Sequence, residues 1–147
     1  MEKYETKQQQ IRKPAEMVWG VMSDFNNFTS LVVNKVEGWH VDGDECSFRV
    51  KGMTVGLRMV EKIPGRLIKI EAADASPVGF TLWMQFKEVL ADGEGPDSEG
   101  FGGEPDTRMR LVLHAEMNMM LKMMIGGKLQ NGLDQIAAQI AQTFNSI

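Results

Sequence analysis

The segment IRKPAEMVWGVMSDFNNF, residues 11–28, decides the fold that this sequence predicts. Pro14 suits the first turn of a helix, where its missing N–H needs no partner. Apolar side chains then recur at helical spacing, at Met17, Val18, Val21 and Met22. The polar stretch SDFNN, residues 23–27, ends this helix and provides caps for a second short helical turn. The segment therefore predicts the end of a strand followed by two short helices.

Between residues 36 and 117 the apolar pattern changes from helical spacing to alternation. Alternating runs occupy residues 46–51, 55–59, 68–72, 80–87 and 108–117. Turn signals that contain glycine separate several of these runs, at 42–44, 51–52 and 64–65. Repeated strands with one apolar side predict an antiparallel sheet with a dry face and a wet face. A more polar strand is predicted before them, over residues 4–10.

After residue 118 the helical period returns and continues to the last residue. The stripe consists of Ile125, Leu129, Leu133, Ile136, Ile140, Phe144 and Ile147. The Gly126-Gly127 pair lowers helix propensity by about 2 kcal/mol, so a regular helix is predicted from near Lys128. The dry face of the sheet must be covered, and this helix is the only predicted element long enough to lie across it.

The length and composition predict one globular domain spanning residues 1–147. The chain is 43% hydrophobic and 24% charged, with a formal net charge of -4. It shows no secretory signal and no apolar run of the ~18 residues that a membrane-spanning helix needs. We therefore expect a cytoplasmic protein without an integral membrane segment. Without a basic face, nucleic acid is not an expected partner, and a single cysteine with no Cys/His cluster predicts neither a disulfide nor a metal site.

An insertion rich in glycine, proline and acidic residues, 90–106, separates two strong strand predictions. It contains six acidic side chains with no basic residue between them, at Asp92, Glu94, Asp97, Glu99, Glu104 and Asp106. We interpret the insertion as a mobile hairpin loop. A loop that binds a partner protein is the alternative interpretation.

The order of these elements resembles the helix-grip fold of the START-like superfamily, also called SRPBCC, and within it the polyketide cyclase/dehydrase-like branch. The resemblance covers almost the whole chain and rests on a diffuse pattern. It is carried by Ile11, Pro14-Ala15-Glu16, Val18-Trp19, Asp24-Phe25, Phe28 and the segments MVEKIPGRLIKIE (59–71) and FTLWMQFKEV (80–89). Residues 31–33 depart from the pattern, because an aromatic residue often follows the second helix at this place.

The resemblance implies an α+β fold, in which a curved antiparallel sheet of about six to seven strands wraps around the long C-terminal helix. It also implies an elongated, mostly apolar cavity between sheet and helix. Members of the superfamily bind or transfer lipids, sterols, quinones and polyketides, and some are cyclases, but they share no catalytic residue. We therefore expect a small hydrophobic ligand as the partner of this chain, and no cofactor.

The inner phase of the strands and the stripe of the terminal helix give the residues expected to line this cavity. They are Phe48, Val50, Leu57, Met59, Ile70, Leu82, Met84, Leu111, Leu113, Leu129, Gly132, Leu133, Ile136 and Ile140. At Gly132 the missing side chain would leave volume for a ligand, allow close packing on the sheet, or simply be tolerated. The methionines between residues 117 and 124 would form either a pliable entrance or ordinary core filling.

One alternative function is a cyclase/dehydrase-type enzyme that uses the same cavity. His40 would be its acid or base if the imidazole pointed inward. Gln8 or Gln10 could present an amide to the cavity and fix the polar end of a ligand. Cys46 shares the inner phase, but the sequence locates no base that would activate it as a nucleophile.

A second alternative is a protein-interaction module, similar to START-like cochaperones, acting through the acidic insertion or an exposed sheet face. Trp83 and His114 both fall on the wet phase of their strands. An exposed tryptophan can anchor a contact with another protein. Trp83 therefore leaves a homodimer contact open.

Overall fold

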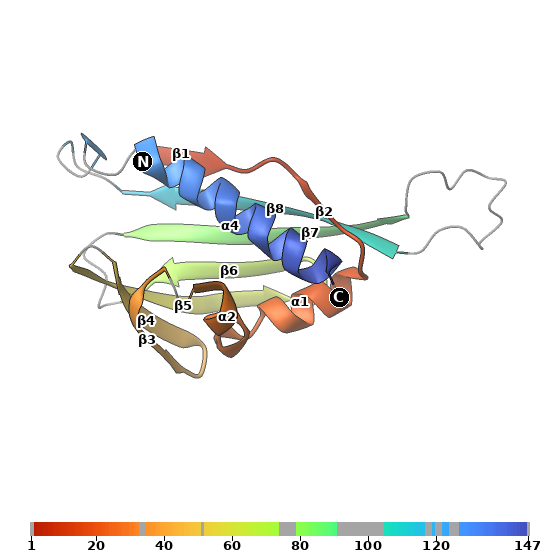
Figure 1. The fold of residues 1–147 in the computed structure, drawn as a ribbon, viewed down its shortest axis with the longest axis horizontal. Helices are drawn as coiled ribbons and strands as arrows, with labels where there is room; N and C mark the ends of the chain where they lie inside the picture. The colour runs from red at the N-terminus through yellow and green to blue at the C-terminus, as the bar shows by residue number, and fades with distance from the viewer. Residues whose placement is uncertain are drawn as a thin grey trace, which may run out of the picture.

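The computed structural model describes residues 2–32, 35–50, 52–73, 79–90, 105–116, 119, 122–123 and 127–146, and shows one antiparallel sheet crossed by a long helix (Figure 1). The helical elements are α1 (Ala15–Met22), the 3-10 turn η1 (Phe25–Phe28), α2 (Thr29–Val32) and α4 (Gly127–Asn145). The strands are β1 (Glu2–Glu5), β2 (Gln9–Ile11), β3 (Glu37–Asp42), β4 (Glu45–Val50), β5 (Met53–Ile63), β6 (Leu67–Ala72), β7 (Phe80–Leu90) and β8 (Pro105–Ala115). This order confirms the predicted succession of strand, short helices, strands and terminal helix.

The sheet has the strand order β1-β8-β7-β6-β5-β4-β3, and β2 also pairs with β8. The described residues form eight strands, where about six to seven were expected, because the polar strand predicted over residues 4–10 is divided into β1 and β2. At the break, the Thr6 N–H donates to the Leu111 carbonyl and the Thr6 hydroxyl accepts from the Leu111 N–H, both at 3.0 Å. The threonine side chain replaces a backbone acceptor, so both short strands can share β8.

Tight turns join the middle strands where the glycine signals predict them. Gly52 and Gly65 have φ values of 79° and 73°, in the left-handed region that favours glycine. With the turn at Gly43 between β3 and β4, these reversals keep β3 to β6 in consecutive antiparallel order. Alternate side chains of the four strands therefore share one face of the sheet.

The hydrophobic core lies between one face of the sheet, here called the inner face, and the helices. The buried inner-face residues include Cys46, Met59, Ile68, Ile70, Met84, Phe86, Met109 and Leu111. The segment 11–28 contributes Ile11, Val18, Met22 and Phe25, which are at most 1% exposed. The residues that predict the fold thus also fill its core.

Two carboxylates satisfy backbone groups at the beginnings of the short helical elements. The Ala15 N–H at the start of α1 donates to Glu88 Oε2 on β7, at 2.9 Å. Asp24 caps η1 as predicted, since its Oδ1 accepts from the Asn26 N–H at 2.9 Å. The first contact also fixes the start of α1 to the end of β7.

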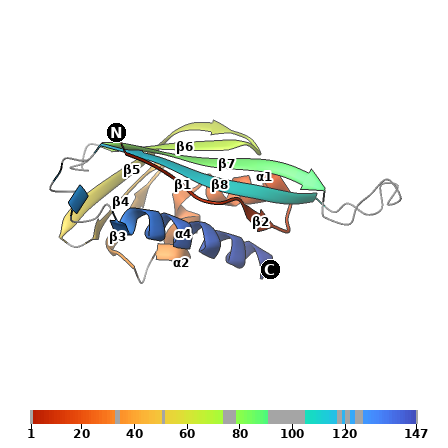
Figure 2. The ribbon, with the colours of Figure 1, turned by 90° about the horizontal axis from the view of Figure 1, so that it is seen from above.

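Helix α4 is amphipathic and lies across the inner face (Figure 2). Its buried residues are Leu133, Ala137, Ile140, Ala141 and Phe144. This set follows the predicted stripe with alanines added and with Ile136 left 46% exposed at its border. None of the helices in the described ranges, α4 included, is long and apolar enough to cross a membrane.

Amide side chains hold one flank of α4 against β1 and β2. Near the start of the helix, Gln130 Nε2 donates to the Glu5 carbonyl at 2.9 Å. Near its end, Asn145 donates to the Gln10 carbonyl at 2.9 Å and accepts from the Arg12 N–H at 2.7 Å. The asparagine therefore uses both halves of its amide on the strand backbone, and the lateral position of the helix is fixed at two points.

The opposite flank of α4 is tied to the segment between α2 and β3. Lys35 Nζ donates to Gln139 Oε1 across this side of the helix. Trp39 Nε1 on β3 donates to Thr29 Oγ1 on α2 at 2.9 Å. Helix α2, the start of β3 and α4 are thus joined by side chains, whereas the other flank binds strand backbone.

Two predicted features fall mainly outside the described residues. Residues 91–104 of the acidic insertion lie outside, so neither interpretation of that insertion is tested. In the methionine segment, Met119 and Met123 are described and are 80% and 83% exposed. Core filling is therefore excluded at these two positions.

Candidate functional site

The inner face of the sheet is fully covered along one row of side chains and partly open along the next. Leu111, Met84 and Ile68 are cross-strand neighbours on β8, β7 and β6, and each is at most 2% exposed. Two residues along the strands, Leu113 and Leu82 face each other and are only partly buried. Side chains two residues apart share a face, so the change in burial runs along the inner face itself.

Six partly buried residues of the inner face lie toward the same end of the sheet, which we call the open end. They are Tyr4, Trp39, Val41, Leu57, Leu82 and Leu113. All of them pack against the buried core, so this surface is an accessible extension of the core. Accessible apolar surface beside a packed core is typical of the lining of small-molecule sites.

One flank of α4 faces the segment that precedes Trp39, since Lys35 donates to Gln139 there. Leu129, Gly132 and Ile136 are three to seven residues apart and lie on the side of the helix that also carries Gln139. A Cβ added at Gly132 would meet no heavy atom within 4 Å. Close packing therefore does not explain this glycine, and free space lies beside it.

The structure places the predicted cavity residues in three groups. The buried group is Met59, Ile70, Met84, Leu111, Leu133 and Ile140. The partly buried group is Phe48, Leu57, Leu82, Leu113, Leu129 and Gly132. Ile136 is exposed, and the side chain of Val50 lies outside the described part of the chain. That these residues together enclose a ligand stays a prediction.

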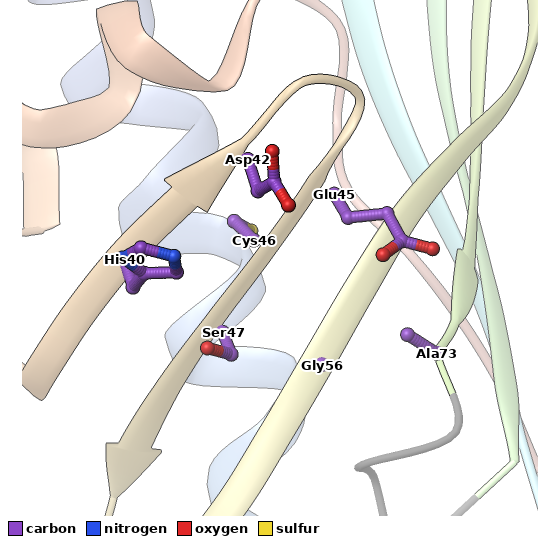
Figure 3. A pocket seen from close by; sticks show the side chains of 7 residues that line it. All are labelled: His40, Asp42, Glu45, Cys46, Ser47, Gly56 and Ala73. Atoms are coloured by element: carbon purple, nitrogen blue, oxygen red, sulfur yellow. The ribbon is translucent and has the colours of Figure 1, made fainter.

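His40 lies on the outer face of the sheet. It alternates along β3 with Trp39 and Val41, whose larger apolar surfaces take the inner face. With Asp42, Glu45, Cys46, Ser47, Gly56 and Ala73 it lines a pocket of about 240 Å³ over β3, β4 and β5 (Figure 3). The cyclase hypothesis required an inward-pointing His40, and the structure does not meet this condition.

The described polar residues of the outer pocket are not arranged as a nucleophile hydrogen-bonded to a base. His40 and Ser47 are cross-strand neighbours, but no hydrogen bond joins His40 to Ser47 or to Asp42 among the described residues. Glu45 is engaged by Arg58 at 3.6 Å. Across the described ranges, no group of three or more His, Cys, Asp or Glu side chains is arranged to hold a metal ion. The pocket thus lacks the pair of nucleophile and base that covalent catalysis needs.

A second pocket, of about 600 Å³, lies between the start of α1 and the turn from β5 to β6. It is lined by Ala15, Glu16, Pro64, Gly65, Arg66, Phe86, Lys87 and Glu88. Two acidic and two basic side chains balance in charge, and Glu88 already binds the Ala15 N–H. Residues of the open end line neither this pocket nor the outer one.

Cys46 is a buried free thiol on the inner face. Burial raises its pKa to about 12, although a backbone hydrogen bond from Leu57 acts in the opposite direction. We predict that iodoacetamide at pH 8 alkylates Cys46 readily in urea and very slowly in the folded protein, because little thiolate forms there. Mass spectrometry of timed samples measures both rates, and equal rates would contradict the prediction.

The raised pKa of Cys46 also makes folding stability depend on pH. The thiol stabilises the folded state fully below pH 9.0, and this contribution is lost as pH rises toward 12.

Three further candidates lie on the outer face. Gln10 Nε2 donates to Asp106 Oδ2 at 2.6 Å, so its amide is not presented to the inner face. Trp83 contacts His114 edge to face with ring centroids 4.7 Å apart, and Lys69 Nζ lies 5.9 Å from the centre of the indole ring. The wet-phase assignment of Trp83 and His114 is confirmed, and the outer face carries ordinary surface contacts at these positions.

Comparisons with known proteins identify the fold through structure alone. No model of a known protein family matches the chain, and no curated protein does. Norcoclaurine synthase from Thalictrum flavum, solved with dopamine and hydroxybenzaldehyde, is similar with a TM-score of 0.68 and 10% identity, over 97% of this chain and 84% of that one. The chain has the helix-grip fold.

Two further structures with this fold are similar over nearly their whole length. The Aha1 dimer from Colwellia psychrerythraea gives a TM-score of 0.66 at 14% identity, covering 99% of this chain and 97% of that one. XoxI from Bacillus cereus gives a TM-score of 0.63 at 15% identity, covering 98% and 96%. At such identities the likeness establishes the helix-grip architecture and no residue's function.

Sequence reasoning missed several residues that position the site. Tyr4 gives a usable signal, since it is an aromatic residue in an otherwise polar predicted strand. Gln130 and Asn145 give no such signal, because the sequence pattern of a helix does not distinguish an amide that binds a strand from one that faces solvent. Lys35 likewise lies between predicted elements, where no pattern applies. The residues that set the position of α4 in this helix-grip fold therefore had to come from the structure.

Proposed function

We propose that this chain binds or transfers a small and mainly apolar ligand held between the sheet and α4. The observation that supports the proposal best is the open end, where apolar inner-face side chains beside the packed core remain accessible. A ligand that covered them would remove apolar surface from water, at about 25 cal/mol per Å². Lipids, quinones and polyketide-like compounds have the required chemistry.

The free space beside Gly132 adds support from the helix side. A ligand between sheet and helix needs volume that side chains do not fill, and a Cβ at Gly132 would reach no neighbour within 4 Å. The norcoclaurine synthase structure shows that a protein with this fold holds small aromatic molecules. At 10% identity, however, its ligands identify none for this chain.

Binding and transfer are preferred to catalysis because they need no reactive side chain at the ligand. A cyclase-type reaction needs a group that moves a proton within hydrogen-bond reach of the substrate. His40 is on the outer face, and the buried Cys46 thiol resists deprotonation. Neither His40 nor Cys46 can therefore serve as the acid or base of the enzymatic alternative.

Substituting Gly132 tests the proposed location of the ligand. We predict that Gly132→Leu weakens binding of the neutral fluorescent probe N-phenyl-1-naphthylamine by about fivefold or more, because the new side chain takes volume from the ligand. The same substitution should raise the free energy of unfolding by about 1 kcal/mol, since glycine is a poor helix former. Fluorescence titration and urea unfolding measure the two effects.

Ala138→Leu is the matched control, because Ala138 is exposed on the same helix. It adds an equal side chain on the solvent side and should leave the probe affinity unchanged. Equal loss in both variants would show that the probe does not bind beside Gly132. Native mass spectrometry of the wild-type protein would then identify any ligand retained from the cell, and a protein that binds no apolar probe and carries no ligand would contradict the proposed function.

A further inference from the structure

Tyr4 is an inner-face residue whose hydroxyl has no hydrogen-bond partner among the residues that the structure describes. The β1–β8 register pairs Tyr4 with Leu113, which in turn faces Leu82 on β7. The aromatic ring packs against the core and the residue is partly exposed. Among the described residues, nothing makes a hydrogen bond to its hydroxyl.

The other polar groups of the inner face near the open end are already engaged. Glu2 is 2.6 Å from Lys122 Nζ, in an ion pair. The Trp39 indole N–H donates to Thr29 Oγ1. Of the described strand residues at this end, Tyr4 alone combines inner-face orientation with a hydrogen-bonding group that no other described residue satisfies.

The surroundings of Tyr4 favour an acceptor oxygen on a ligand. Lys122 Nζ is paired with Glu2, which lies two residues before Tyr4 on the same face of β1. The lysine provides positive charge at this end of the inner face, although Glu2 neutralises most of it. A phenol donates readily to a carbonyl or carboxylate oxygen, and the adjoining ammonium group would stabilise either.

We infer that the ligand is an amphiphile, in which one carbonyl or carboxylate oxygen accepts a hydrogen bond from Tyr4 while an apolar body extends over Leu113 and Leu82 toward Leu57. This inference rests on the proposed function and adds the class of ligand. Adjacent strands are about 4.8 Å apart, so the apolar body would extend roughly 10 Å from β1 to β7 alone. Such a ligand accepts a hydrogen bond from the Tyr4 hydroxyl and covers the apolar side chains of the open end.

Tyr4→Phe tests this inference because it removes only the hydroxyl. Decanoic acid, methyl decanoate and decane each compete with N-phenyl-1-naphthylamine, and their affinities are compared in the wild type and the variant. We expect Tyr4→Phe to weaken the acid and the ester by about threefold to tenfold, the loss of one hydrogen bond, and to leave decane unchanged. Trp83→Phe, on the outer face, should leave all three affinities unchanged.

The outcomes separate this inference from the proposed function. If the three compounds and the probe bind the wild type and Tyr4→Phe changes none of them, the amphiphile proposal is wrong and ligand binding remains. If nothing binds the wild type, both fail. If Tyr4→Phe weakened binding of the acid but not of the ester, the phenol would not be the hydrogen-bond donor to the ligand. The preference for the acid would then come from the charge of Lys122.

The chain contains a single tyrosine, which provides a second readout in the unaltered protein. Tyrosine labelled with ¹³C at Cζ gives one NMR signal, whose chemical shift reports hydrogen bonding of the phenol. We expect methyl decanoate to shift this signal and decane to leave it in place. An unchanged signal at saturating ester would exclude a hydrogen bond between Tyr4 and the ligand.

Discussion

Replacing Phe25 with alanine is expected to lower the free energy of unfolding by about 3–5 kcal/mol, the range for a fully buried aromatic residue. Phe25 is 0% exposed and contacts Phe28 edge to face, with ring centroids 5.3 Å apart. Its removal leaves a cavity in the hydrophobic core beside η1. Urea unfolding followed by circular dichroism measures the change in the free energy of unfolding. A variant too unstable to purify would indicate a loss of stability at least as large as predicted.

Met17→Ala is the control for this prediction because Met17 lies on α1, a helix in the same segment. It is 40% exposed, so its truncation should cost less than about 1 kcal/mol. If Phe25→Ala cost no more than Met17→Ala, the segment 11–28 would not have the role in the core that its burial indicates.

Asn145→Ala is expected to lower the free energy of unfolding by about 1–3 kcal/mol, because it removes two hydrogen bonds worth about 0.5–1.5 kcal/mol each. The lost contacts are those to the Arg12 N–H and the Gln10 carbonyl. The Arg12 amide should also exchange its hydrogen faster with solvent, because its acceptor is gone. Urea unfolding and amide exchange by NMR measure the two effects separately.

Gln142→Ala provides the comparison, since Gln142 is exposed on the same turn region of α4. Its truncation should change neither the stability by more than about 0.5 kcal/mol nor the exchange of the Arg12 amide. Unchanged exchange at Arg12 in Asn145→Ala would mean that the amide of Asn145 does not hold the strand in solution.

The architecture was predictable because its signals are redundant. Alternation in five separate runs, a helical stripe at the end and the segment 11–28 all indicate the same arrangement, so local errors do not change it. The division of the first strand escaped prediction, because it depends on the hydroxyl of Thr6 reaching the Leu111 N–H. A contact between residues 105 positions apart leaves no local pattern.

The site was predictable only in its apolar part. The alternation correctly assigned Leu82, Leu113 and Leu57 to the inner face, but it treated every inner residue alike. Which of them stay accessible depends on where α4 and α2 lie over the sheet. That position is set by Gln130, Asn145 and Lys35, whose partners are far away in the sequence.

The phase of β3 shows how such an ambiguity is resolved. Trp39 with Val41, and His40 with its neighbours, compete for the same face in the sequence. The larger apolar surface of Trp39 and Val41 decides the competition, and a one-residue change of phase turns every side chain of the strand over. Hypotheses that rest on a single inward-pointing residue of a short strand therefore require the structure.

The contacts between β2 and α4 have a consequence for biosynthesis. The hydrogen bond from the Arg12 N–H to Asn145 joins residues 133 positions apart. Likewise, β1 cannot pair until β8 has been synthesised. During translation the first strands and the inner face remain without their cover until α4 leaves the ribosome. Long-range closure of this kind slows folding, and an uncovered apolar sheet is prone to aggregate. We therefore expect nascent chains that end before α4 to depend on chaperones.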